Sequence, residues 1–586
     1  MALHGIIILI IQESEVSFSL SEMLSNSLIL SKSVLILLSV LILARCLRSL
    51  LSERYEAEVW AWLQLGKEQL PVTHWENLIG RSRSADIRVD RAQVSRVHAV
   101  LVRSGKGVWT VYDIFSKGGV WVNRIKISPH GAEVHNGDVI NIGGTPLRFK
   151  DMTTEKRQQL EGKRTAAGKR VSPFGTLLEL SVFQIFLLLQ HALCSPEDLT
   201  LIALAFAALL ALEWFCYSSM RLLGRSGFEI ETIAFYLSSL GLSVAASSVP
   251  EDLVKQILLM IAGVALFLLM GWWLRSLRRV TAARGLAAFA ALALLAVNAV
   301  FSEEIMGARN WLSFGGYSFQ PSEFVKVLYL YVGASTLDRL YRKQNLFVFM
   351  AFSAICVIAL ALIGDFGTAL VFFVCFLVIS FLRSGSIATV LLALTGAGMA
   401  GVLAVSVKPH IARRFAAWGH VWEDIYGAGY QQARAMSAAA AGGLFGKGAG
   451  SGWLKNIVAA DTDMVFAVVC EEQGLIIAIC MVLAVMALAF FAVRSARYGR
   501  SAWYAIAACG AMAMLLTQTA LNVFGTMDLL PFTGVTFPFV SRGGSSLLSC
   551  WMLMAFLKGS DTRRDASFVV NPVRVIPGTG EGKAKA

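Results

Sequence analysis

Long apolar runs constrain the fold of this chain more than any other feature of its sequence. Hydrophobic residues make up 56% of its 586 residues, and many apolar runs come close to the length of about 20 residues that a helix needs to cross a bilayer. The sequence therefore predicts a polytopic α-helical membrane protein of about 13 spans. The predicted spans are 28–45, 174–190, 199–217, 229–246, 256–274, 283–301, 322–340, 345–363, 366–382, 386–406, 464–493, 503–524 and 536–557.

The positive charge follows the predicted spans. The formal net charge is +13, and Lys and Arg gather in short clusters beside apolar runs, for example at 275–279 and 494–500. Such clusters are typical of cytoplasmic loops. Alternation of the spans then predicts that the N-terminus and the loops 302–321, 364–365 and 407–463 lie outside, with the C-terminus inside.

The composition disfavours nucleic-acid binding, a disulfide framework and a cysteine metal site. No basic stretch is interleaved with base-stacking aromatic residues, so we expect no nucleic-acid binding. The nine cysteines are scattered singly and give neither a disulfide framework nor a metal-ligand spacing.

Changes of composition divide the chain into six segments. The first apolar run ends in Arg45 and Arg48 and has no small-residue cleavage site behind it, which indicates an anchor and not a signal peptide. The predicted segments are the anchor (1–50), a soluble β-rich domain (73–150), a flexible basic linker (151–172), two extra spans (174–217), a ten-helix core (229–557) and a disordered cytoplasmic tail (559–586).

The soluble segment has the pattern of a β-sandwich. Its strand candidates are separated by Gly, Asn and Ser turns, and they are IRVD, HAVLVR, VWTVYDI, GVWVN and DVINI. The order and spacing of Gly80-Arg81, 94–99, 116–120 and 136–138 resemble a forkhead-associated (FHA) domain.

The FHA resemblance implies a phosphothreonine site. In that family the arginine and serine that match Arg81 and Ser95 clasp the phosphate, with Arg96 beside them, because a guanidinium fork and a hydroxyl suit a dianion. The histidine that matches His98 is mainly structural. The family usually has asparagine at Gly118, so an FHA scaffold that does not bind phosphothreonine is the alternative.

A pair of carboxylates marks the candidate active site. The stretch 447–473 is a glycine-rich basic loop that leads into Asp461 and Asp463 at the mouth of an apolar helix. Ionisable groups beside a membrane span are costly and suggest function. The alternative is a solvated loop end.

A second charged group is predicted at the start of the span 322–340. Arg309 and Trp311 precede it at an outer interface, and Gln320 begins a Gln-Pro-Ser-Glu cap. Glu323 and Lys326 are three residues apart on one helical face, so they can pair inside the membrane boundary. Capping alone is the alternative for Glu323.

Two further outer features complete the candidate site. Asp365 lies in the tight turn between two spans, where an N-cap role is the alternative. The stretch 529–549 interrupts an apolar region with two prolines and several glycines and hydroxyls. Broken backbone at membrane depth is tolerated when it lines a cavity, so we expect a substrate groove here.

These motifs together resemble the SEDS family of FtsW, RodA and SpoVE. They are GARNWLSFGGYSFQPSEFVK, GDFGTAL, GYQQARAMSAAAAGGLFGKGAGSG, DTDMVFAVVCEEQG and LPFTGVTFPFVSRGGSS, in this order. The resemblance implies a peptidoglycan glycosyltransferase that polymerises the lipid-linked disaccharide-pentapeptide, lipid II, on the outer face of a bacterial plasma membrane.

The resemblance also assigns residues. The essential aspartate of the family matches Asp463, its buried Glu and Lys match Glu323 and Lys326, and its Gln-Pro-Asp aspartate matches Asp365. The chain departs from the family at Asp461, which is usually histidine, and at Ile363-Gly364, which are usually Gln-Pro. Arg542, usually tyrosine, adds a cation near the groove. The hydroxyls of the last motif are Ser541, Ser545 and Ser546.

A mechanism follows from these residue types. Asp463 is the candidate base for the acceptor hydroxyl. Arg309, Lys447 and Lys455 are candidate cations for the departing pyrophosphate. Glu471 or Glu472 would support the helix face of Asp463. A divalent cation, Mg or Mn, could be held by the carboxylates, with Asp463 as its ligand, and no organic cofactor is expected.

The expected partners are a class B penicillin-binding protein, whose transpeptidase would cross-link the strands, and a phosphothreonine protein or Ser/Thr kinase. Two alternatives are a transporter or flippase of lipid-linked precursors and a phosphothreonine-reading membrane scaffold. Division, elongation and sporulation remain open as the process served.

Overall fold

The protein is described from a computed structural model. The described residues are 2–52, 58–82, 85–104, 107–153, 155–156, 160, 173–194, 198–225, 227–305, 308–314, 317–337, 343–385, 387–407, 409–563 and 566–569.

The described part of the chain contains 10 helices that are long and apolar enough to cross a membrane. The first, α1, runs over Ala2–Ser52, and its apolar stretch is Asn26–Leu51. The others are α3 (Pro173–Cys194), α4 (Leu199–Leu222), α5 (Glu229–Ser248), α6 (Leu253–Trp273, preceded by the turn η1, Pro250–Asp252), α8 (Arg284–Phe301), α10 (Lys343–Ile363), α11 (Phe366–Ser384), α17 (Leu475–Arg497) and α18 (Ala502–Thr526).

The predicted count of about 13 spans is not confirmed. Three predicted spans correspond to helices outside that set, namely α9 (Pro321–Leu337), α12 (Ile387–Val407) and α19 (Gly544–Ser560). α9 and α19 have 17 residues each, and α19 begins late because the chain from 527 to 543 is irregular. The predicted break in regular backbone therefore exists, and it shortens the last helix.

The predicted span 464–493 was wrong as one continuous helix. It is divided at Gly474 into α16 (Val465–Gln473) and α17. Gly474 has a φ of 91°, and a Cβ at this position would collide with the carbonyl of Leu444. The glycine thus lets the loop around Leu444 approach the helix axis, which apolar periodicity does not reveal.

The soluble domain is a two-sheet sandwich, as predicted, with mainly antiparallel pairing. One sheet has the order β2-β1-β11-β10-β7-β8, and the other has the order β4-β3-β5-β6-β9. The strands are β1 (Ala61–Leu65), β2 (Glu68–Val72), β3 (Glu76–Gly80), β4 (Ile87–Arg88), β5 (Ala99–Arg103), β6 (Trp109–Asp113), β7 (Val120–Val122), β8 (Ile125–Lys126), β9 (Ala132–Val134), β10 (Val139–Ile142) and β11 (Thr145–Asp151).

The sandwich begins before the predicted boundary at residue 73. β1 pairs with both β2 and β11, so it lies inside one sheet and not in a linker. Leu63 on β1 and Phe149 on β11 are Cα partners, and both are buried in the core between the sheets. The hairpin formed by β1 and β2 is short, and its alternation is weak, which is why the sequence pattern missed it.

The sandwich docks on the turn between α17 and α18. His74 donates from Nδ1 to the carbonyl of Gly499 at 2.6 Å, and the amide of Trp75 donates to the carbonyl of Arg500 at 2.6 Å. The guanidinium of Arg500 in turn binds both carboxylate oxygens of Glu58, at 2.7 and 3.0 Å. The soluble domain is therefore joined to the helical core by polar contacts on both sides of β1 and β2.

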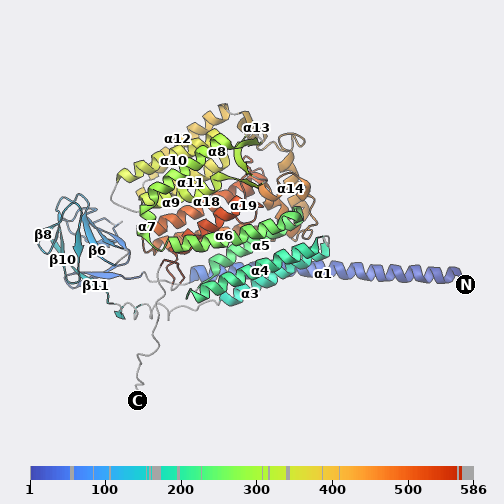
Figure 1. Cartoon of the computed structure of the whole chain (residues 1–586), viewed down its shortest axis with the longest axis horizontal. Helices are drawn as coiled ribbons and strands as arrows, with labels where there is room; N and C mark the ends of the chain where they lie inside the picture. The colour runs from blue at the N-terminus through green and yellow to red at the C-terminus, as the bar shows by residue number, and fades with distance from the viewer. Residues whose placement is uncertain are drawn as a thin grey trace, which may run out of the picture.

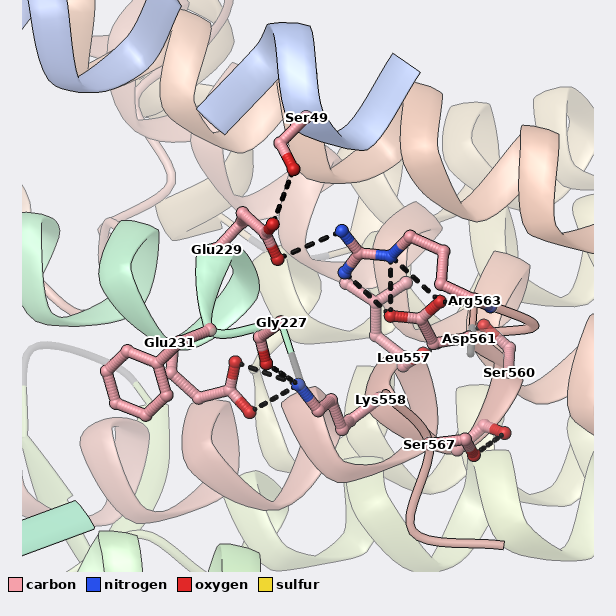
Figure 2. A network of polar contacts seen from close by, with 12 residues as sticks. Ser49, Gly227, Glu229, Glu231, Leu557, Lys558, Ser560, Asp561, Arg563 and Ser567 are labelled. Carbon is pink, nitrogen blue, oxygen red and sulfur yellow. Dashed lines mark hydrogen bonds and ion pairs between the residues drawn. The ribbon is translucent and has the colours of Figure 1, made fainter. Parts of the chain in front are cut away.

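Figure 2 shows a buried charge cluster. It adjoins this junction, because Arg500 donates to the carbonyl of Asp561 at 3.0 Å. Arg563 binds Glu229 on α5 at 2.9 Å and Asp561 at 2.7 Å. Lys558, at the end of α19, binds Glu231 on α5 at 2.9 Å, and Ser49 of α1 donates to Glu229 at 2.5 Å. The cluster fastens three helices that are far apart in the sequence.

The segment after α19 corrects the predicted disordered tail. Residues 561–563 and 566–568 are buried. The ring of Phe568 packs on that of Phe267 at 5.1 Å between centroids, and Arg275 donates to the carbonyl of Phe568 at 2.9 Å. The tail prediction for 570–586 lies outside the described residues, as does most of the predicted linker 151–172.

The two ends of the helical bundle carry different parts of the molecule (Figure 1). The β-sandwich lies at one end. At the opposite end lie the N-terminus, α13 (Pro409–Ala417) and α14 (Tyr430–Gly442). The predicted outer loop 407–463 is thus remote from the sandwich.

Candidate active site

A large cavity opens beside the predicted carboxylate pair. Its volume is about 820 Å³. Polar and charged residues line one part of it, including Asp252, Lys255, Thr462, Arg542 and Ser545. The remaining wall is mainly apolar and comes from α6, α8, α9, α19 and β14 (Tyr317–Phe319). Such a cavity suits an amphipathic ligand with a polar head and a hydrocarbon tail.

Thr462 lines this cavity, whereas its neighbour Asp463, the last residue of the short helix α15 (Ala460–Asp463), is not among the lining residues. The half-buried carboxylate of Asp463 lies against Gly534, where a Cβ would be 3.0 Å from Oδ2. Burial raises the pKa of Asp463 to about 6, and the negative charge of Asp461 adds to the rise, while Thr462 and Arg414 oppose it. A carboxyl with this pKa can accept a proton near neutral pH.

Asp461 has a different environment from Asp463. The guanidinium of Arg542 binds its carboxylate, and the Arg542 amide donates to its carbonyl at 2.9 Å. Arg542 also binds Asp252, at the end of η1, at 2.5 Å. The predicted extra cation therefore does line the cavity, but it is shared between two carboxylates that hold the loop 541–543 against α15.

The glycine-rich loop is held by Glu471 of α16. Glu471 is buried and accepts from Lys447 Nζ at 2.8 Å, and also from the amides of Trp453 and Leu454 at 3.2 and 3.0 Å. The latter two amides begin the turn η2 (Leu454–Asn456). Glu471 thus supports the loop and its cation. The predicted support of Asp463 along one helix face does not apply, because α15 and α16 are separate helices.

The second carboxylate of α16, Glu472, binds a neighbouring helix. Glu472 accepts from Ser247 of α5 at 2.7 Å, and Lys455 donates to the carbonyl of Gly450 at 2.7 Å. Both candidate cations of the loop therefore have partners, Lys447 on α16 and Lys455 within the loop.

Glu323 and Lys326 form the predicted buried pair on α9, with Nζ and Oε2 2.5 Å apart. Ser549 of α19 donates to the same Glu323 oxygen at 2.7 Å. The pair joins α9 to α19, one helix from each side of the cavity.

The predicted outer residues around Asp365 also come together. Asp365 caps α11 by accepting from the Thr368 amide at 3.0 Å, and it accepts from Gln320 and Ser322 at 3.3 Å each. The N-cap alternative thus describes its main contact, and its other oxygen ties α11 to the start of α9.

The hydroxyls of the last motif have distinct contacts. Ser545 accepts from the Gln320 amide at 3.0 Å, Ser546 bonds Thr536 at 2.8 Å, and Ser541 donates to the Thr462 carbonyl at 2.5 Å. The first lines the cavity, while the last fixes the backbone beside Asp463.

Trp311 lies on β13 (Ala308–Phe314), half-buried, and lines the cavity. β13 pairs with β12 (Glu303–Ile305) and β14, so the described residues between α8 and α9 form a small sheet. The side chain of Arg309, on the same strand, lies outside the described part of the structure.

The described residues beside the cavity offer few ligands for a divalent cation. Among the residues that the structure describes, no three His, Cys, Asp or Glu side chains form a ligand group, and Asp461 is bound by Arg542. Asp463 remains as one carboxylate beside the cavity. Magnesium is often held by one or two carboxylates together with substrate phosphates, and Asp463 meets this requirement.

Three residues near the site were missed by sequence reasoning. Asp252 binds Arg542, Arg414 acts on Asp463 by its charge, and buried Asn522 donates to the carbonyls of Asp463 and Val535 at 2.9 Å each. The pair Arg413-Arg414 could have been noticed in the sequence. Basic pairs favour the cytoplasmic side, so a basic pair on a predicted outer loop is unusual.

The residues of the predicted phosphate site lie close together on the sandwich. Arg81 and Arg96 are exposed and Ser95 is half-buried. The Arg81 amide donates to the Ser95 carbonyl at 3.0 Å, and Ser95 Oγ accepts from the Lys117 amide at 3.2 Å. Two arginines and a hydroxyl thus share one edge of the domain.

His98 and Gly118 lie beside the predicted phosphate site. Buried His98 accepts from the Ser95 amide at Nδ1 (3.0 Å) and donates from Nε2 to the Gly119 carbonyl (2.9 Å), which is a structural role. At Gly118 a Cβ would lie 2.8 Å from Gly143 Cα, so an asparagine there would need a local shift.

Comparison with known proteins gives two family matches. A model described as a cell cycle protein, FtsW, RodA and SpoVE, matches residues 228–565. The FHA domain model matches residues 77–143.

The chain is also similar to individual known proteins. The chain is 30% identical over 319 residues to peptidoglycan glycosyltransferase RodA of Mycobacterium leprae, with 52% of this chain and 68% of that protein covered. It is 32% identical over 262 residues to stage V sporulation protein E of Bacillus subtilis, with 42% and 69% covered. A solved peptidoglycan synthase complex includes a chain that is 25% identical, with 56% and 96% covered and a TM-score of 0.48.

Proposed function

The chain belongs to the FtsW, RodA and SpoVE family, and from this membership we propose that it is a peptidoglycan glycosyltransferase that polymerises lipid II into glycan strands. The observation that carries the substrate assignment is the cavity of about 820 Å³, whose lining combines apolar side chains with polar residues that include Thr462, the neighbour of Asp463. A polyprenyl chain fits the apolar walls, and a pyrophosphate-linked sugar fits the polar end.

The roles of the residues follow from their surroundings. Asp463 accepts the proton of the attacking sugar hydroxyl, and its raised pKa favours this at neutral pH. Lys255 and Arg542 line the cavity. Lys255 brings positive charge toward the pyrophosphate that leaves, and Arg542, whose charge is balanced by two carboxylates, offers N–H donors beside it. Asp252 and Asp461 orient Arg542, so that its guanidinium is fixed before the substrate binds.

A divalent cation belongs to this proposal as a bound helper. When present, Mg²⁺ or Mn²⁺ would supply further positive charge for the leaving pyrophosphate, and Asp463 is the residue that would hold it, in which case Asp463 would act as a ligand and not as the base.

The proposal is tested with the purified full chain and lipid II, with and without a class B penicillin-binding protein. Glycan strands that a muramidase digests are the expected product. Translocation of lipid II across vesicles without polymerisation would contradict the proposal and would favour the flippase alternative.

We expect the pH profile of polymerisation to have an acid limb, in which kcat/KM falls as the pH decreases through about 6. The pKa of Asp463 is raised from 3.8 to about 6, so the carboxylate is ionised at pH 7.5 and mostly protonated at pH 5. Protonation removes the base, and kcat/KM should fall about tenfold between these two values. The measurement is a pH series of initial rates, with each sample returned to pH 7.5 to verify that it is still folded.

The variant Asp461→Asn provides the control for this limb. The charge of Asp461 raises the Asp463 pKa, so its removal should move the limb to lower pH. A wild-type limb near pH 4, as for an unperturbed aspartate, would contradict the assignment of Asp463 as base.

The FHA domain is proposed to bind a phosphothreonine protein, which would recruit or regulate the enzyme. We expect Arg81→Ala to weaken binding of a phosphothreonine peptide at least tenfold, because a charge-assisted pair to the phosphate is lost. Calorimetry with a phosphopeptide library measures this, and the exposed Arg148→Ala, on β11, is the control. Equal binding by the unphosphorylated peptides would exclude the phosphate site.

The proposed cellular setting is a bacterial plasma membrane. The sandwich and the C-terminal residues would lie in the cytoplasm, and the N-terminus and the carboxylate pair outside. The position of the sandwich and the loop at opposite ends of the bundle supports this orientation (Figure 1).

A further inference from the structure

Three helices lie outside the family match and yet pack against the core. These are α1, α3 and α4, which precede residue 228, where the match begins. α1 packs on α3, α5 and α17, and α3 packs on α5. These three helices, called the added module below, therefore contact the core as well as adding membrane spans.

A polar seam fastens α3 to α5. Gln184 donates to Ser239 at 3.0 Å, and His191 bonds Ser243 at 3.0 Å. Ser239, Ser243 and Ser247 are spaced by four residues on one face of α5, and Ser247 donates to Glu472 of α16. Inside a membrane there is little water to compete for hydrogen bonds between helices. The seam therefore fixes the position of α3 along its axis relative to α16.

The middle of α1 and the C-terminal end of α3 reach the glycine loop directly. Lys32 Nζ of α1 donates to the Gly446 carbonyl at 2.8 Å. Gln190 of α3 is buried, and its side-chain oxygen accepts from the Ala449 amide at 3.3 Å. A Cβ at Gly448 would lie 2.7 Å from Cys194 Sγ of α3, so the loop backbone is packed on the added helices without a gap.

The opposite side of the same loop is held by α16. The amides of Lys447 and Gly448 donate to the carbonyls of Glu471 and Glu472 at 2.9 and 2.8 Å. The loop therefore lies between α16 of the family core and the added helices, which supply the contacts on its other side.

The loop leads straight into the candidate active site. It continues through η2 into α15, which ends at Asp463, and Glu471 ties η2 to Lys447. A shift of the loop would move both the Lys447 charge and the start of α15. Displacement of about 1 Å in a catalytic group can lower a rate by about 100-fold.

We propose that α1 and α3 are a positioning module of the active site, in which Lys32 and Gln190 hold the loop 446–450 and thereby orient α15. The effect on catalysis rests on the proposed function, whereas the effect on the loop does not. Lys32 and Gln190 act through the loop backbone and do not touch the reacting atoms.

The test compares Lys32→Met with Lys32→Arg and Arg45→Met in the full-length protein in lipid nanodiscs. Arg45 also joins α1 to α3, through Glu179 at 2.5 Å, but on the part of α1 that is distant from the loop. Lys32→Met should lower kcat about tenfold with a smaller change in KM. Lys32→Arg should retain most of the activity, and Arg45→Met should stay within twofold of the wild type.

Hydrogen–deuterium exchange supplies a readout that is independent of activity. Amides of 446–450 should exchange faster in Lys32→Met and in Gln190→Leu, and at the wild-type rate in Arg45→Met. Unchanged exchange and kcat in Lys32→Met would overturn the proposal, and so would equal losses in Lys32→Met and Arg45→Met, which indicate loosened packing of α1. If the wild type makes no glycan, the proposed function fails, and the exchange experiment alone decides whether the module holds the loop.

Discussion

Replacement of Asp463 by asparagine should reduce lipid II polymerisation by about 10²- to 10⁴-fold, the range of a lost general base. Asparagine keeps the shape of the side chain but cannot accept the proton at neutral pH. The backbone contacts of this residue, from Asp463 N to the Ala459 carbonyl and from Asn522 to the Asp463 carbonyl, do not depend on the carboxylate. The variant should therefore fold normally, and its loss should appear in kcat. Single-turnover polymerisation with fluorescent lipid II measures the effect.

Two further variants separate the base from its surroundings. Glu423→Gln removes an exposed carboxylate from the same outer loop, where its partner is His420, and it should not alter the rate. Asp461→Asn should cost less than Asp463→Asn, because it loosens Arg542 without removing the base. Activity of Asp463→Asn within tenfold of the wild type would mean that another group accepts the proton.

The largest effect on stability is expected for Lys558→Met. Lys558 and Glu231 have exposed side-chain fractions of 0% and 1%, so the substitution leaves a buried carboxylate without its cation (Figure 2). Removal of one partner of a buried pair costs about 3–5 kcal/mol. The free energy of unfolding in detergent micelles should fall by that amount, with a lower thermal midpoint.

The double variant Lys558→Met with Glu231→Gln is the control for this interpretation. It removes both charges, and we expect it to recover more than half of the lost stability, because a neutral amide is less costly to bury than an unpaired carboxylate. Arg88→Met breaks the exposed pair with Asp90 on the sandwich, 2.7 Å apart, and should change stability by less than about 1 kcal/mol. A single Lys558→Met variant as stable as the wild type would show that Glu231 is neutral or hydrated.

Much of the architecture was predictable because it depends on local pattern. Most apolar runs became spans, and the strand candidates from 87 to 142 became β4, β5, β6, β7 and β10. The pair Glu323 and Lys326 was predicted from a spacing of three residues on one helix. The Asp365 cap was likewise visible as a carboxylate in front of an apolar run.

Other parts of the site could not be read in this way. Nothing in the spacing of Asp252, Asp461 and Arg542 shows that they meet, since 290 residues separate Arg542 from Asp252. The role of Gly474 was hidden as well, because a glycine within an apolar run looks like a tolerated residue until another backbone is found beside it. The same holds for Lys32, which looked like a single charge within an anchor.

The sequence by itself determined the membrane class, the sandwich, the order of the motifs and the residue types available for chemistry, because bilayer thickness and strand alternation act on neighbouring residues. Only the tertiary structure decided which charges are paired and which remain for the substrate. Lys447 and Arg542 have carboxylate partners, whereas Asp463 is half-buried beside the cavity. Ion pairs form over a few ångströms, and helix packing alone brings such distant residues within that range.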